Sequence, residues 1–325
     1  MRVVITGGGG FLGRKLAQRI LSDGSLAGAD GRPHEVEQLV LFDQVAPPAA
    51  ETADPRVEVV TGDIADADSV RAVIAPGTAS VFHLASVVSA GAEADFDLGY
   101  RVNLDGMRHV LEAARALGTA PKVLFASSIA VYGGELPETV EDDTPVTPQT
   151  SYGAHKMIGE YLLSDYTRKG YLDGRAMRLP TIVVRPGKPN LAASGFASGI
   201  VREPLNGIDF TCPVSPESRM AIMSPRTVID CFMHLQALDA DALGPWRGLL
   251  LSGFSVSMAE TVAALEAVAG DRRRGAISFA VDPQIQAIVD AWPRTSYSAR
   301  AERLGFPRDH DIAEIIRAYI EDELD

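Results

Sequence analysis

The chain has 325 residues, enough for one large domain or two smaller ones with a substantial core. Its formal net charge of -13 disfavours nucleic acids and anionic membranes as partners, because both attract clustered cations. We find no apolar run that would span a bilayer and no signal-peptide pattern at the amino terminus. Cys212 and Cys231 alone do not make a disulfide framework. We expect a cytoplasmic protein of enzyme size.

The first half of the chain alternates short β-branched runs with longer amphipathic segments. The predicted strands cover residues 2–6, 38–43, 56–63, 79–85, 121–128 and 176–185. The predicted helices lie near residues 10–22, 66–74, 100–117 and 151–170. Apolar strands separated by helices are typical of a parallel sheet that is covered on both faces. The pattern predicts an α/β fold with a doubly wound parallel sheet of the Rossmann type.

After residue 185 the pattern becomes less regular. Pro, Gly and Ser crowd residues 185–199, and amphipathic helices are predicted at 227–238 and 311–324. We therefore predict a dinucleotide-binding Rossmann domain over residues 1–185. Residues 186–325 are predicted to form mainly a smaller substrate-binding domain, some elements of which return to the Rossmann sheet.

The stretch ITGGGGFLG follows the first strand and opens the first helix. Its glycines permit a tight turn, a close approach of the backbone to a pyrophosphate and close helix–sheet packing. A merely flexible glycine-rich turn is the alternative, but the strand before the stretch and the helix after it favour a dinucleotide. The predicted cofactor contacts in this loop are Gly7, Gly10, Phe11, Leu12 and Gly13.

Asp43 ends the second strand and is the candidate ligand of the adenosine ribose. A carboxylate there accepts hydrogen bonds from both ribose hydroxyls and repels a 2′-phosphate, which favours NAD over NADP. A turn-forming aspartate is the alternative. Asp43 lies thirty residues after Gly13 instead of the usual ~20, and we attribute the difference to a surface loop insertion over residues 22–35.

Asp63 and Ile64 follow the third strand, where a carboxylate can meet the adenine amino group and an apolar side chain can flank the ring. The competing interpretation is a helix N-cap, for which Asp63, Asp66 and Asp68 are all candidates. The residues alone leave both interpretations open.

Two further segments carry candidate chemical groups. Ser127 and Ser128 stand at the carboxyl end of the fifth strand, where open α/β sheets bind ligands, although paired serines also occur in ordinary turns. Tyr152 and Lys156 stand one helical turn apart in SYGAHK, a spacing that is also common on solvated helix faces. The glycine loop provides the context that favours an acid–base pair.

Five motifs, in this order, resemble the extended short-chain dehydrogenase/reductase superfamily of the sugar epimerase/dehydratase type: TGGGGFLG, HLAS, VNLDG, SSIAVYG and YGAHK. The resemblance spans roughly residues 1–186 and implies NAD as the cofactor. It also implies a homodimer formed through the helices near 100–117 and 151–170. The catalytic residues that it implies are Ser128, Tyr152, Lys156 and Asn103, the last of which helps to hold a proton-relay water.

The same resemblance implies further contacts. Those with the cofactor involve Leu84, Ala85, Ser127, Tyr152, Lys156, Pro180 and Ile182, with Pro180 against the nicotinamide. Those with the substrate involve Ser86, Ser128 and Tyr152.

The mechanism implied for these residues depends on charge. The ordinary pKa of tyrosine, near 10, is too high for a base at neutral pH. The Lys156 ammonium and the nicotinamide charge both favour the phenolate, and so lower that pKa. Tyr152 would then take a proton from a substrate hydroxyl while hydride moves to NAD, and Ser128 would stabilise the developing carbonyl. We expect His83 to be a hydrogen-bonded core residue, His155 to point away from the pair, and no metal site.

The segment after the sixth strand suggests an acidic substrate. RLPTIVVRPGKPN lacks the Asn and Tyr-Gly-Pro that nucleotide-sugar enzymes commonly carry there, and arginines follow it. Guanidinium groups bind carboxylates in bidentate fashion, although each arginine alone could equally be a solvated surface charge. The predicted substrate contacts are Arg185, Asn190 and Arg219.

Together with GIVREPLNG and MSPR, this segment looks like a bacterial subgroup often labelled sugar epimerases. The resemblance implies NAD-dependent oxidation of a small four-carbon sugar acid of the D-erythronate type at C2. Two alternatives stay open: a nucleotide-sugar epimerase or dehydratase that retains its NAD, and a non-catalytic NAD-binding sensor. The intact Ser–Tyr–Lys set counts against the sensor, which needs no base.

Overall fold

The computed structural model describes residues 1–187, 194–270, 272 and 274–324. The chain forms two compact units, and each consists of three segments. Unit 1 comprises Met1–Ser128, Thr150–Arg178 and Ile229–Leu249. Unit 2 comprises Ile129–Gln149, Leu179–Val228 and Leu250–Asp325. Because the units interleave along the chain, the single boundary at residue 185 stays a prediction.

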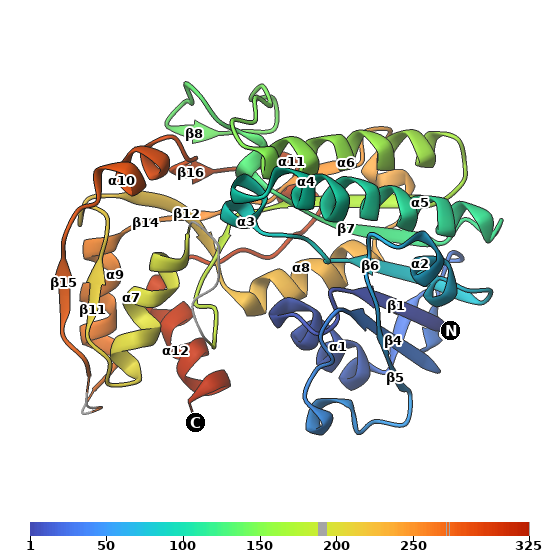
Figure 1. The fold of residues 1–325 in the computed structure, drawn as a ribbon, viewed down its shortest axis with the longest axis horizontal. Helices are drawn as coiled ribbons and strands as arrows, with labels where there is room; N and C mark the ends of the chain where they lie inside the picture. The colour runs from blue at the N-terminus through green and yellow to red at the C-terminus, as the bar shows by residue number, and fades with distance from the viewer. Residues whose placement is uncertain (188–193, 271, 273, 325) are drawn as a thin grey trace. The chain divides into compact units, whose positions relative to one another are not determined.

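Unit 1 is built around a seven-stranded sheet in the order β13-β9-β7-β6-β1-β4-β5. Figure 1 labels five of these strands, β7, β6, β1, β4 and β5. The strands are β1 (Arg2–Thr6), β4 (Gln38–Asp43), β5 (Val57–Thr61), β6 (Thr78–His83), β7 (Lys122–Ser128), β9 (Asp173–Leu179) and β13 (Gly248–Leu250). The pairs β1–β4, β1–β6, β4–β5 and β6–β7 are parallel. The predicted doubly wound parallel sheet is confirmed.

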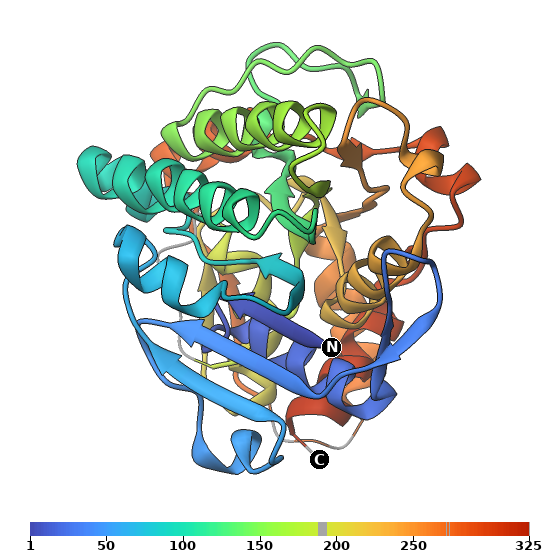
Figure 2. The same cartoon turned by 90° about the vertical axis from the view of Figure 1, so that its right-hand side faces the viewer.

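Helices cover this sheet, and Figure 2 shows α5 and α6 above its strands. The helices are α1 (Phe11–Asp23), α2 (Ala67–Val73), α3 (Ser89–Ala94), α4 (Phe96–Gly99), the π-helical turn η2 (Tyr100–Asp105), α5 (Gly106–Ala116), α6 (Ser151–Arg168) and the end of α8 (Pro225–Ala237). Their apolar faces and the strands share a core that includes Val4, Val40, Phe42, Val81, Val110, Leu111 and Phe125.

The winding of the sheet reverses between β1 and β6. Strands β4 and β5 extend the sheet from one side of β1, and β6, β7 and β9 extend it from the other. Open α/β sheets bind ligands beyond the carboxyl ends of their strands at such a reversal. The glycine loop follows β1, the HLAS motif begins at the end of β6, and the paired serines end β7. The fold therefore brings three predicted motifs to one edge of the sheet.

Unit 2 contains smaller sheets and a core of its own. Its strands are β8 (Thr139–Val140), β10 (Thr181–Ile182), β11 (Phe210–Cys212), β12 (Arg219–Met223), β14 (Phe254–Ser257), β15 (Ile277–Phe279) and β16 (Thr295–Ser296). Its helices include α7 (Gly195–Leu205), α9 (Met258–Val268), α10 (Pro283–Asp290), α11 (Ala299–Arg303) and α12 (Ile312–Glu323). Buried side chains of α7, α9 and α12 pack together, among them Ile200, Leu265, Ile316 and Ile320.

Three predicted elements differ from the structure. The predicted helix over 100–117 begins with the π-helical turn η2. The predicted strand over 176–185 is divided at Pro180, which lacks the N–H group that a ladder needs. The predicted loop insertion over 22–35 contains an antiparallel pair, β2 (Ser25–Ala27) and β3 (Pro33–Glu35). Within the part of the chain that the structure describes, the helices are too short or too polar to cross a bilayer.

Candidate active site

Close backbone contacts shape the glycine loop after β1. Gly7 has a φ of 76°, and a Cβ there would lie 2.7 Å from the amide nitrogen of Ala85. A Cβ at Gly13 would overlap the carbonyl oxygen of Gly7. A Cβ at Gly10 would meet only that same oxygen, at 3.2 Å. The fold itself thus requires glycine at positions 7 and 13, whereas Gly10 leaves space for a ligand.

The amino terminus of α1 is left without a side-chain cap. Gly10 is the N-cap and offers no side-chain acceptor, whereas the side chain of Asp66 caps α2. The first-turn N–H groups of Phe11, Leu12 and Gly13 have no acceptor within the helix. Uncapped N–H groups at the positive end of a helix dipole attract phosphate. The loop therefore fits the pyrophosphate of a dinucleotide.

Asp43 lies beside the glycine loop. Its Oδ2 atom accepts the N–H of Gly9 at 3.1 Å, and its Oδ1 atom accepts the N–H of Val45 at 3.2 Å. A carboxylate offers about four acceptor sites, so these two bonds leave capacity for hydroxyl donors. Asp43 therefore forms a turn and still has acceptors for a ribose, and the two interpretations of this residue are compatible.

The segment after β5 separates two roles that the sequence left open. Asp66 is the N-cap of α2, because its carboxylate accepts the N–H groups of Asp68 and Ser69. Asp63 instead accepts the N–H of Ala65 at 2.9 Å within the loop. Ile64 is buried, and a Cβ on the facing glycine of α5 would meet its side chain at 3.1 Å. The capping role therefore belongs to Asp66, and the adenine contacts of Asp63 and Ile64 stay predictions.

Asn103 lies in the π-helical turn η2 and holds the loop after β6. Its Oδ1 atom accepts the Ser86 hydroxyl at 3.0 Å and the N–H of Val87 at 2.8 Å, and its Nδ2 atom donates to the Val87 carbonyl. Leu84 and Ala85 are half-buried in the same loop. The side chain of Asn103 is thus engaged by the loop that carries Ser86, and the water-holding role predicted for it is untested.

The two serines that end β7 differ in their surroundings. Ser127 is 2% exposed, and its hydroxyl donates to Oε1 of Glu160 at 2.5 Å. Successive side chains of a strand point to opposite faces, and Ser128 is only half-buried. Ser128 is therefore the better placed of the two for a ligand, and the cofactor contact of Ser127 stays a prediction.

Helix α6 brings Tyr152 and Lys156 together. Lys156 is 3% exposed, and its ammonium lies 5.3 Å from the centre of the Tyr152 ring and 4.8 Å from that of Phe125. Its Nζ atom donates to the carbonyl of Ala126 on β7 at 2.8 Å. Burial lowers the pKa of Lys156 to about 7, and the nearby Glu160 carboxylate acts in the opposite direction. The predicted pair therefore lies together at the end of β7, with Lys156 buried and Tyr152 half-buried.

The two histidines near these motifs are buried. His83 shares a hydrogen bond of 2.7 Å with the Thr6 hydroxyl and stacks on Phe125, and burial lowers its pKa to about 3. It is the hydrogen-bonded core histidine that we predicted. His155 packs edge-on against Tyr100 at 4.6 Å, and its ring nitrogens have no hydrogen-bond partner among the described residues.

The remaining predicted contacts belong to unit 2. Pro180 is buried, and Ile182 pairs with β12 in parallel register. The guanidinium of Arg185 donates to the Ser194 hydroxyl at 2.9 Å. Asn190 lies outside the described residues.

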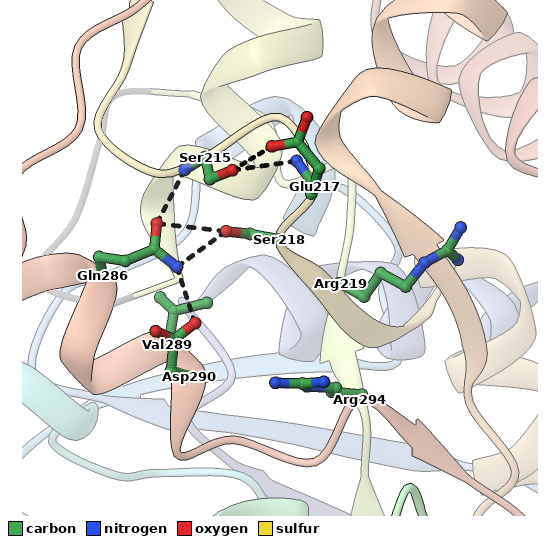
Figure 3. A pocket seen from close by; sticks show the side chains of 8 residues that line it. All are labelled: Ser215, Glu217, Ser218, Arg219, Gln286, Val289, Asp290 and Arg294. Carbon is green, nitrogen blue, oxygen red and sulfur yellow. Dashed lines mark hydrogen bonds between the residues drawn. The ribbon is translucent and has the colours of Figure 1, made fainter.

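Arg219 lines a pocket of about 280 Å³ within unit 2 (Figure 3). The lining residues are Ser215, Glu217, Ser218, Arg219, Gln286, Val289, Asp290 and Arg294. Two of the polar lining residues are hydrogen-bonded to each other, because the side-chain oxygen of Gln286 accepts the N–H of Ser215 at 2.8 Å. Arg219 is exposed and pairs with Glu260 at 2.5 Å, whereas the Arg294 guanidinium has no partner among the described residues. Figure 3 shows the side chains of Arg219 and Arg294 extending in opposite directions, so a carboxylate in this pocket would meet one guanidinium group or the other.

Sequence reasoning missed three residues of interest. Arg294 stands alone in WPRTS, with no motif around it. Glu160 and Arg178 form a buried ion pair of 2.8 Å behind Ser127. One signal could have identified this pair, namely a glutamate one helical turn after Lys156 and a charged residue within an apolar strand.

The glycine loop after β1 and the Tyr152–Lys156 pair at the end of β7 lie at the same edge of one parallel sheet, which is the arrangement of Rossmann-fold oxidoreductases. The model of the NAD dependent epimerase/dehydratase family matches residues 3–221, and the chain belongs to this family.

Similar proteins cover nearly the whole chain. The D-erythronate dehydrogenase of Cupriavidus necator is 51% identical over 322 residues, covering 99% of this chain and 98% of that protein. The D-erythronate dehydrogenase of Haemophilus influenzae is 42% identical over 321 residues, covering 99% of each chain. The solved structure of the nucleoside-diphosphate-sugar epimerase from Agrobacterium tumefaciens has a TM-score of 0.93 and 40% identity, covering 100% of this chain and 94% of that one.

The protein is therefore an NAD-dependent oxidoreductase that acts on a CH–OH group, and NAD is its cofactor. The glycine loop and the uncapped end of α1 fit that cofactor. Among the described residues, no cluster of three or more His, Cys, Asp or Glu could hold a metal ion.

Proposed function

We propose that the protein oxidises the C2 hydroxyl of a small sugar acid of the D-erythronate type to the 2-oxo acid, with Tyr152 as the base. The observation that carries this proposal is the likeness, over nearly the whole chain, to two proteins named D-erythronate dehydrogenase. The closeness of the Tyr152 ring to a buried ammonium supports the choice of base.

Each reacting residue has one task in this reaction. The Ser128 hydroxyl holds the substrate oxygen in place and donates to the carbonyl as it forms. The Tyr152 oxygen takes the hydroxyl proton, and the Lys156 ammonium favours the phenolate by its charge. NAD, when bound, accepts the hydride that leaves C2. The glycine loop would hold the pyrophosphate of NAD, and Asp43 would hold its adenosine ribose.

The acidic group of the substrate needs a cationic partner. We assign it to Arg219, because the present partner of Arg219 is Glu260 and both side chains are about half exposed. An exposed ion pair contributes little free energy, so a substrate carboxylate can replace Glu260 at small cost. Arg185 and Arg294 are the other candidates in unit 2.

A substrate panel tests the proposal. Purified protein is incubated with NAD and separate aldonates, uronates and UDP-sugars, and NADH is followed by its absorbance. We expect net NADH formation with D-erythronate or a similar four-carbon acid, and none with erythritol, which lacks the carboxylate. Epimerised UDP-sugar without NADH, detected by NMR, would instead identify a nucleotide-sugar epimerase that retains its NAD. Absence of any turnover would favour the NAD-binding sensor.

The Arg219 assignment has a matched control in the same pocket. Arg219→Met should raise the KM for the acid at least tenfold with little change in the KM for NAD, because a bidentate charged contact is lost. Arg294→Met is the comparison. If only the Arg294 variant raises the KM for the acid, the carboxylate partner is Arg294.

We further propose a homodimer formed through α6 and the helices around Tyr100. Large apolar side chains are exposed there, namely Phe96 on α4 at 57% and Ile158 and Tyr161 on α6 at 36% and 59%. Exposed apolar groups gathered on adjacent helices are typical of protein interfaces. We expect the protein to sediment as a dimer at micromolar concentration and Ile158→Asp to sediment as a monomer. A monomeric wild-type protein would exclude this interface. The cytoplasmic location stays a prediction for cell fractionation.

A further inference from the structure

We propose that Glu160 is a positioning residue that acts on the reaction through Lys156 and through the serine-bearing end of β7. This inference rests on the proposed catalytic role of Lys156. The role of Glu160 follows from its place on α6, from its buried partners and from its negative charge, which among the described residues is the one that acts on the Lys156 ammonium.

Glu160 is held in one position by donors from two strands. It is 0% exposed. Arg178 on β9 donates to it through Nε at 3.0 and 3.1 Å and through Nη2 at 2.8 Å. The Ser127 hydroxyl on β7 donates to its Oε1 atom at 2.5 Å. A Cβ at Gly248 on β13 would overlap its Oε2 atom. The carboxylate is therefore confined by α6 and three strands of the sheet.

The spacing on α6 connects this carboxylate to the reacting pair. Tyr152, Lys156 and Glu160 follow one another at four-residue intervals, so their side chains share one face of the helix. Lys156 donates to the carbonyl of Ala126, and Ser127 is the next residue of β7. One helix face and one strand end thus carry the phenol, the ammonium, the carboxylate and the substrate-facing Ser128.

The charges around Lys156 show why Glu160 matters. His83 on β6 is neutral, since burial lowers its pKa to about 3. On α6 itself, the pKa of His155 is lowered by burial and by the Lys156 charge. Glu93 on α3 faces His155, and its carboxylate accepts the N–H of Ser151.

Helix α5 also carries an acidic residue close to α6, Glu112, but its carboxylate binds other groups. Glu112 accepts the hydroxyl of Tyr166, far along α6 from Lys156, and pairs with Arg115. The remaining charged groups on α5 and η2 include Arg101 and Arg108, which are exposed, and the half-buried Asp105, which pairs with Arg108 at 3.9 Å. Glu160 is the group that opposes the effect of burial on Lys156, which would otherwise lose its proton at still lower pH.

Two consequences follow for the reaction. With Glu160 present, Lys156 keeps its proton over a wider pH range and can favour the Tyr152 phenolate by its charge. The bond from Ser127 to Glu160 also fixes the strand end, so that the Ser128 hydroxyl and the Ala126 carbonyl keep their places. Glu160 itself has no contact with the reacting atoms in this scheme.

The test is an NMR titration of lysine side chains that needs no substrate. The chain has only five lysines, so protein labelled with ¹³C at lysine Cε gives few signals, and Lys156→Met identifies the signal of Lys156. In Glu160→Gln we expect the titration midpoint of Lys156 to fall by roughly one pH unit or more, because the negative charge that opposes the effect of burial is removed. At pH values above that midpoint, turnover should be about tenfold lower than in the wild type for each pH unit by which the midpoint has fallen.

A second buried ion pair on the same strand supplies the matched control. Asp173 on β9 pairs with the buried Arg175 at 2.6 Å. Burial and the Arg175 charge lower the pKa of Lys122 to about 8, and the Asp173 charge acts in the opposite direction. Asp173→Asn should therefore lower the midpoint of Lys122 and leave that of Lys156 unchanged. Glu160→Gln should instead lower the midpoint of Lys156 and leave that of Lys122 unchanged. This crossed result separates a local charge effect from general loosening of the unit.

A further variant covers the case in which Glu160→Gln does not fold, because that change leaves Arg178 buried without its partner. Glu160→Gln combined with Arg178→Met removes both charges, and such replacements of a buried pair are often tolerated. This double variant should also lower the titration midpoint of Lys156. An unchanged Lys156 midpoint in a folded variant overturns the proposal. If Tyr152→Phe retains turnover while Glu160→Gln still lowers the Lys156 midpoint, the proposed role of Tyr152 as the base fails and the action of Glu160 on Lys156 stands.

Discussion

Replacing Tyr152 by Phe should reduce kcat by at least a factor of about 10²–10⁴ while leaving NAD affinity nearly unchanged. The change removes one oxygen atom, the proposed proton acceptor, and retains the ring. The aromatic face beside the Lys156 ammonium is preserved, so the buried charge keeps its neighbour. Stopped-flow or steady-state formation of NADH measures kcat, and calorimetric titration measures NAD binding.

Tyr166→Phe is the matched control for this variant, because it removes the same atom from the same helix. The Tyr166 hydroxyl donates to Glu112, and burial together with that bond raises its pKa to about 12. We expect a small loss of stability in Tyr166→Phe and no change in turnover. Tyr152→Phe with wild-type turnover would show that another group takes the proton.

The strands of the sheet could be predicted from the sequence, because a strand that is buried on both faces is a continuous run of apolar residues. The predicted strands 2–6 and 38–43 match β1 and β4 in full, since each is a continuous apolar run. The hairpin within 22–35 was missed because the residues of β3 are all exposed and carry no apolar alternation. The π-helical turn at 100–105 was missed because its side-chain pattern is that of an ordinary helix.

The parts of the site that were predictable are local in sequence. The glycine loop and the Tyr152–Lys156 pair each lie within one short segment, and the spacing of the residues within each segment indicates its function. The partners of Glu160 could not be read in this way. Arg178 lies 18 residues further along on β9, and the two meet because α6 packs on the same sheet, against β7. The fold decides which charged groups share a buried site.

Replacing Lys156 by Met should stabilise the fold at pH 6 while reducing turnover at least a hundredfold. A buried ammonium costs free energy whenever it is charged, and a drop in the pKa of Lys156 from 10.5 to about 7 corresponds to roughly 5 kcal/mol. Methionine has a similar shape and no charge. Loss of the bond to the Ala126 carbonyl costs about 1–3 kcal/mol, so we expect a net gain of a few kcal/mol at pH 6.

The pH dependence of this gain has a definite sign. Between about pH 7 and 10.5 the unfolded chain holds a proton on Lys156 that the folded chain has released, so the stability of the wild-type protein rises with pH. Below pH 7 both states hold the proton and the full cost is present. The advantage of Lys156→Met should therefore be largest at pH 6 and should decline by about 1.4 kcal/mol per pH unit above pH 7.

Urea unfolding at pH 6, 7.5 and 9 measures this decline, with Lys169→Met as the control. Lys169 is exposed at the end of the same helix and has no cost of burial, so its replacement should change stability little and equally at each pH. A Lys156→Met variant that is less stable than wild type at pH 6 would mean that the contacts of the ammonium outweigh its burial. If the extra stability of Lys156→Met shrinks with rising pH and turnover is lost, the buried charge of Lys156 lowers the stability of the fold and is needed for the reaction.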